Sequence, residues 1–140
     1  MLIDGELCAL DAHGRSRFQL LQNALNKKAK LLYVVFDTLF VCGRDIHEKP
    51  LLERKKILKS LMPRDQLLRY SKHVAEFGRR EFAKAVRAHE EGVIAKRATG
   101  FYYSGKRTRE WLARLLPPGG DADQRDDRRE NFPVADDRFL

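Results

Sequence analysis

The chain has 140 residues and is basic, with 28 Lys and Arg against 20 Asp and Glu and a net charge of +8. Its hydrophobic share of 43% is normal for a folded protein. It contains no apolar run of ~18 residues and no signal peptide, so nothing in it points to a membrane or to export.

The positive charge is concentrated in one part of the chain. Residues 1–115 hold 24 Lys and Arg against 13 Asp and Glu, whereas residues 116–140 hold 4 against 7. A basic body favours a nucleotide, a nucleic acid or another polyanion as partner, although many cytoplasmic proteins are basic without one. The segment 116–140 contains Pro-Pro-Gly-Gly and then scattered Asp and Arg without periodicity, which predicts a disordered tail.

Hydrophobic periodicity predicts alternating strands and helices before that tail. Ser16 is predicted to cap the first helix, and Pro50 to open the second. Cys8 and Cys42 have no metal-ligand spacing and are expected to be buried free thiols in a reducing compartment. In chain order, the predicted elements are the strand Leu2–Leu10, the helix Arg17–Lys28, the strand Leu31–Val41, the helix Leu51–Leu61, the strand Leu67–His73, the helix Gly78–His89, the strand Gly92–Lys96 and a short element Glu110–Leu116.

This alternating order is compatible with two sheet types. It mimics a parallel α/β fold, but no glycine-rich phosphate loop follows any strand, so neither a P-loop nor a dinucleotide fingerprint is present. A mixed or antiparallel α+β sheet fits the order at least as well. The chain also begins directly with a strand, so we expect that it starts within a domain.

Three segments draw attention because of their order. They are Asp4-Gly5-Glu6 on the first strand, Phe36-Asp37 inside the most hydrophobic strand, and Glu91–Arg97 around the strand Gly92–Lys96. Taken singly, each has an ordinary reading: a polar tripeptide near a turn, a core phenylalanine and a strand with polar ends. A carboxylate and a basic pair flanking a short strand also suit a divalent metal and a phosphate.

Together these segments resemble the adenylation (nucleotidyltransferase) domain of ATP-dependent DNA ligases, and most closely the ligase domain of bacterial non-homologous end-joining enzymes. The resemblance implies a partial nucleotidyltransferase, ATP-grasp-like domain over residues 1–115. It implies an α+β fold with mixed, mainly antiparallel sheets and flanking helices. The segments that resemble the family's motifs are Leu2–Leu7, Tyr33–Asp37, Pro50–Lys55, Glu91–Arg97 and Tyr102–Trp111.

The resemblance also implies roles for individual residues, with ATP and Mg²⁺ as cofactors. Glu6 would contact the ribose of ATP or support the metal, and Phe36 would stack on the adenine. Glu91 would hold or orient the Mg²⁺ ion, and Lys96 would lie near the nucleotide phosphate. Trp111 is expected to be a packing anchor.

The basic loop that precedes Trp111 is expected to meet DNA. Lys106, Arg107 and Arg109 would contact DNA phosphates or close over the site, and the alternative is a solvated surface loop. The implied partners are nicked or broken duplex DNA and other end-joining proteins. The implied location is the bacterial cytoplasm, at the nucleoid.

Two family features are missing from the sequence. The family's nucleophilic lysine lies in a Lys-x-Asp-Gly motif, but Leu2 holds the lysine position before the only Asp-Gly of this chain, Asp4-Gly5. Ala113 and Leu115 stand where the family's fifth motif has lysines. We therefore expect a fragment, cut at both ends, that is inactive alone. The alternatives are a nucleotide- or DNA-binding remnant without catalysis and an unstable gene product.

Overall fold

The computed structural model describes residues 1–24, 29–75, 78–88, 90, 92–106, 108 and 110–115. They fall into two compact units. Unit 1 is Met1–Lys72, and unit 2 begins at His73. The predicted tail, residues 116–140, lies outside the described residues.

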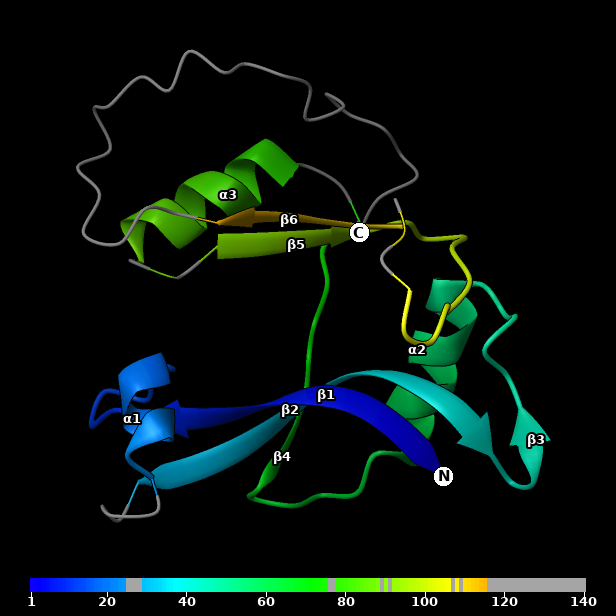
Figure 1. The fold of residues 1–140 in the computed structure, drawn as a ribbon, viewed down its shortest axis with the longest axis horizontal. Coiled ribbons are helices and arrows are strands. Elements are labelled where there is room, and N and C mark those ends of the chain that lie inside the picture. The colour runs from blue at the N-terminus through cyan, green and yellow to red at the C-terminus, as the bar shows by residue number, and fades with distance from the viewer. Residues whose placement is uncertain are drawn as a thin grey trace. The chain divides into compact units, whose positions relative to one another are not determined.

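Unit 1 is built around one long central strand (Figure 1). In this sheet β2 (Lys30–Val41) pairs antiparallel with β1 (Leu2–Leu10) and β3 (Arg44–Asp45), and parallel with β4 (Leu68–Tyr70). β-branched and aromatic residues fill β2, which suits a strand with neighbours on both sides. The prediction of a central strand here is confirmed, and so is a mixed sheet; the parallel α/β reading is wrong.

The short strand β3 follows a tight turn at Cys42 and Gly43. Cys42 and Gly43 both have positive φ, 50° and 77°, as a two-residue hairpin loop requires. A strand of two residues is too short for any periodicity, so β3 was not predicted. Cys42 is exposed at this turn and Cys8 is half-buried, so the expectation of two buried thiols is wrong, although both are free.

Two helices accompany this sheet. The helix α1 (Phe18–Gln22) is shorter than predicted, and Arg17, not Ser16, takes the N-cap position without a side-chain bond. The C-terminal residues predicted for this helix, 25–28, lie outside the described residues. The helix α2 (Leu51–Leu61) has the predicted bounds with Pro50 as its N-cap. No described helix has the length and apolar character to cross a membrane.

Unit 2 is a helix packed on a two-stranded antiparallel sheet. The helix α3 (Gly78–Arg87) buries Ala85, and β5 (Gly92–Lys96) pairs with β6 (Trp111–Leu115). The predicted strand is confirmed, and the predicted helix is confirmed as far as Arg87. Ala88 is a turn, and residue 89 lies outside the described residues. The short element predicted at the end is β6.

The strand predicted over Leu67–His73 is shorter in the structure. Only the three residues of β4, in unit 1, pair with β2.

Candidate functional site

The structure brings Glu6 and Phe36 together on the β1–β2 ladder. Glu6 is exposed and pairs with Val34, two residues before Phe36. In such a ladder, diagonal neighbours lie about 7–8 Å apart, within reach of long and aromatic side chains. The resemblance assigns both residues to adenosine binding, and that role stays a prediction.

Phe36 sits at an irregularity of this ladder. Asp4 pairs with Asp37 and Gly5 with Val35, so Phe36 is an extra residue in β2 with no residue opposite it. Such β-bulges bend a strand and re-aim its side chains, and they occur often beside functional sites. Phe36 thus stands at one of the two register shifts of this ladder; the other lies near its end, between Leu2 and Ile3.

Glycine is required at position 5 by the close approach of β2. A Cβ atom on Gly5 would lie 2.6 Å from the backbone oxygen of Val34 and 3.0 Å from the ring of Tyr33. Any larger residue would push β1 away from β2 next to the bulge. The glycine of Asp4-Gly5-Glu6 therefore has a structural reason in this chain: it lets β1 and β2 approach closely beside Phe36.

A buried ion pair lies directly after the bulge. Asp37 and Arg54 are both 0% exposed, and two parallel bonds of 2.8 Å join the carboxylate to Nε and Nη2 of the guanidinium. The carboxylate also accepts the N–H of Thr38 at 2.8 Å. Arg54 donates further to the backbone oxygens of His47 and Lys49. The pair therefore ties β2 to α2 and to the segment before it, and its buried charges are well hydrogen-bonded.

The next residue of α2, Lys55, reaches the backbone of the bulge itself. Its Nζ donates to the backbone oxygens of Phe36 at 3.3 Å and Ser71 at 3.0 Å, and lies 4.9 Å from the centre of the Tyr70 ring. Burial lowers the pKa of the Lys55 ammonium, and the Asp37 carboxylate opposes that shift. Burial also raises the pKa of Tyr70.

Arg54 and Lys55 were not predicted as buried residues, although the sequence contains a signal for them. Leu51 and Leu58 lie on one face of α2, and positions 54 and 55 fall on that same face because helical neighbours recur every three or four residues. Two charged residues on an apolar helix face indicate buried partners, here Asp37.

In unit 2, Lys96 lies against an aromatic ring. It pairs with Trp111 across the β5–β6 ladder, and its Nζ lies 3.5 Å from the centre of the Trp111 ring. Tyr102 meets the same ring edge-on, with 6.0 Å between centroids. A cation over an indole face is attracted by the π electrons. The packing role predicted for Trp111 is confirmed, and the phosphate contact of Lys96 stays a prediction.

Several predicted site residues cannot be placed. Glu91, the predicted metal ligand, and Arg107 and Arg109 of the basic loop lie outside the described residues. Lys106 is exposed, as a DNA contact or a solvated loop would both require. Within the described part of the chain, no three His, Cys, Asp or Glu side chains come together as a metal site. No reaction step is assigned to a metal.

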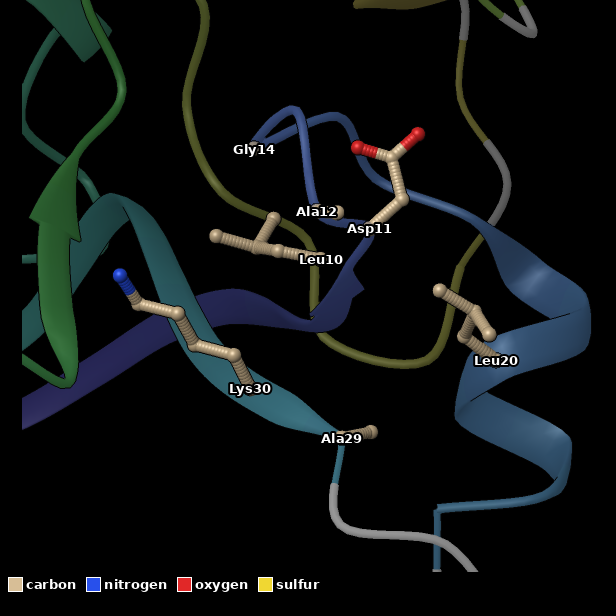
Figure 2. A pocket seen from close by; sticks show the side chains of 7 residues that line it. All are labelled: Leu10, Asp11, Ala12, Gly14, Leu20, Ala29 and Lys30. Carbon is tan, nitrogen blue, oxygen red and sulfur yellow. The ribbon is translucent and has the colours of Figure 1, made fainter.

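A hollow of unit 1 is lined by residues that do not include Glu6 or Phe36, and Figure 2 shows its lining. It has a volume of about 680 Å³. Leu10, Asp11 and Ala12 reach it from the end of β1 and the following turn, and Leu20 reaches it from α1. The carboxylate of Asp11 already has hydrogen-bond partners, because it accepts the backbone N–H groups of His13 and Arg15 at 2.9 Å. We assign the hollow no role in nucleotide binding.

The bonds at this turn predict an acid-sensitive contribution to stability. The N–H of Arg15, with help from His13 and the Arg15 side chain, lowers the pKa of Asp11 to about 2. The contribution of this carboxylate to the free energy of unfolding is therefore fully present above its unfolded-state pKa of 3.8, and it is lost as the pH falls towards the folded-state pKa of about 2. We expect an Asp11→Asn chain to melt below wild type at pH 5 and together with it at pH 2, measured by circular dichroism. An equal difference at both values would contradict this.

Comparison with known families gives a match over most of the chain. Residues 1–113 match the family described as "ATP dependent DNA ligase domain". The multifunctional non-homologous end joining protein LigD of Pseudomonas aeruginosa is 40% identical over 114 residues, which are 79% of this chain and 14% of that protein. The SPbeta prophage-derived DNA ligase-like protein LigB of Bacillus subtilis is 30% identical over 114 residues, or 79% of this chain and 42% of that protein.

Solved structures give the same picture. The ligase domain of Mycobacterium tuberculosis LigD superposes with a TM-score of 0.70 at 29% identity, over 81% of this chain and 36% of that one. A mycobacterial DNA ligase D complexed with ATP and MES gives a TM-score of 0.69 at 29% identity, over 79% and 36%. The chain thus spans less than half the length of each of these relatives.

Proposed function

Since this chain belongs to the ATP-dependent DNA ligase domain family, we propose that its unit 1 forms the adenosine-binding sheet of a bacterial end-joining ligase. One observation carries the proposal: Phe36 is the extra residue at the bulge of β2, two residues after Val34, which pairs with the exposed Glu6. The buried Asp37–Arg54 pair joins this part of β2 to α2. A stacking ring needs such a rigid support, because each loose rotamer would cost binding free energy. The mycobacterial relative complexed with ATP agrees with it.

In this proposal two residues of unit 1 contact different parts of the adenosine. The ring of Phe36 stacks on the adenine, and the carboxylate of Glu6 accepts a hydrogen bond from a ribose hydroxyl. The resemblance further assigns the phosphates to Lys96 and the Mg²⁺ ion to Glu91, and when bound the ion would offset phosphate charge. Lys106, Arg107 and Arg109 would contact the phosphates of duplex DNA.

The proposed reaction begins with an attack that the 140 residues do not supply. A lysine amine displaces pyrophosphate from the α-phosphate of ATP and forms a lysyl-adenylate, whose AMP then passes to a DNA 5′-phosphate before the break is sealed. Leu2 occupies the lysine position before Asp4-Gly5. We therefore propose that these 140 residues bind ATP without becoming adenylated. Sealing of DNA in the nucleoid, together with other end-joining proteins, belongs to the proposed ligase as a whole.

A labelled nucleotide tests ATP binding and adenylation of the chain separately. We expect the 140-residue chain to retain α-³²P-labelled ATP with Mg²⁺ in equilibrium dialysis, with unlabelled ATP displacing it better than GTP. After denaturing electrophoresis no label should remain on the protein. A covalent band would show that the chain holds its own nucleophile, whereas absence of retention at millimolar ATP would contradict the adenosine site.

A further inference from the structure

The buried lysine of α2 is costly for the fold. Lys55 is 5% exposed and keeps its ammonium among backbone oxygens, with Asp37 as the neighbouring opposite charge. The Asp37 carboxylate is already held by both nitrogens of the Arg54 fork. A methionine would fill a similar volume without removing a charge from water. Packing alone therefore does not explain the ammonium at this position.

What the ammonium contacts is the irregular part of the sheet. Its two hydrogen-bond acceptors are the backbone oxygens of Phe36, at the bulge, and of Ser71, just after β4. At a bulge the extra residue loses its place in the ladder and the strand twists locally. A donor beneath the carbonyl of that residue limits the rotation of its peptide plane, and with it the direction of its side chain.

We propose that Lys55 is a positioning residue for nucleotide binding, which holds the carbonyl of Phe36 and so sets the Phe36 ring against the adenine. The inference rests on the proposed function, because it needs Phe36 to stack on a base. The contacts of the Lys55 ammonium are the backbone oxygens of Phe36 and Ser71 and the ring of Tyr70, so in this proposal Lys55 acts through Phe36.

The test reads the stacking geometry directly. 2-Aminopurine riboside triphosphate loses fluorescence when its base stacks on an aromatic ring, and quenching at saturating protein is independent of affinity. We expect strong quenching by the wild-type chain and little by Phe36→Ala. Lys55→Met should quench less than wild type and bind ATP about 3- to 10-fold more weakly, as for one lost hydrogen bond. The exposed neighbour Lys56 provides the matched control, and Lys56→Met should behave as wild type.

A double variant separates positioning from general loosening. If Lys55 acts through Phe36, adding Lys55→Met to Phe36→Ala should change ATP affinity by less than twofold. Folding of every variant is checked by its melting curve. Should Lys55→Met fail to fold, Lys55→Gln replaces it, since its amide keeps a donor but not the reach to both oxygens; its quenching should then be intermediate.

The outcomes are distinct for the two proposals. Wild-type quenching by Phe36→Ala would overturn the proposed adenosine site itself. Loss of quenching in Phe36→Ala, with wild-type quenching in a folded Lys55→Met or Lys55→Gln, would overturn only the positioning role. An additive loss in the double variant would do the same.

Discussion

An Arg54→Met chain is expected to lose about 3–5 kcal/mol of unfolding free energy, because the buried Asp37 carboxylate is left without its partner. The backbone oxygens of His47 and Lys49 lose a donor as well. Small domains are stable by only about 5–15 kcal/mol, so the loss is a large share of the total. Urea unfolding followed by circular dichroism measures it.

Two further variants show whether the charge is the cause. Arg69 lies exposed on β4, so Arg69→Met should change the unfolding free energy by less than about 0.5 kcal/mol. Combining Arg54→Met with Asp37→Leu removes both buried charges and should be more stable than Arg54→Met alone. An Arg54→Met chain as stable as Arg69→Met would refute the buried-pair argument.

Replacing Phe36 by alanine is expected to weaken ATP binding about 5- to 150-fold. Stacking of a base on an aromatic side chain is worth about 1–3 kcal/mol by alanine substitution, which gives this range. Phe36→Tyr keeps a ring and should stay close to wild type. Titration calorimetry with the 140-residue chain measures the affinities.

The control for Phe36 comes from the same strand. Phe40 is 41% exposed near the end of β2, where it pairs with Leu2 and Asp45. Phe40→Ala removes the same atoms at the second register shift of the same ladder, between Leu2 and Ile3, and so away from Phe36 and Glu6. It should leave ATP binding within about twofold of wild type. If both alanine variants weaken binding equally, the effect is a general loss of the sheet, and Phe36 has no special part in the site.

Much of the local structure follows from the sequence alone. The bounds of β1, α2 and β5 were predicted as the structure has them, because apolar spacing and the flanking Pro50 are local signals. The Asp-Gly-Glu and Phe-Asp motifs, together with Glu91–Arg97, pointed to the family, and the resemblance named Glu6 and Phe36 as nucleotide-binding residues. Short or irregular elements were missed: β3 has two residues, and α1 ends early.

The tertiary structure decided what surrounds Phe36. A register shift depends on how two strands pair. Arg54 and Lys55 contact β2 and the segment after β4, whose residues lie 16 or more positions away in the sequence. No window of sequence contains both sides of such a contact. The sequence therefore determined most of the elements and the family of the chain, and the fold determined how Arg54 and Lys55 meet β2 at Asp37 and Phe36.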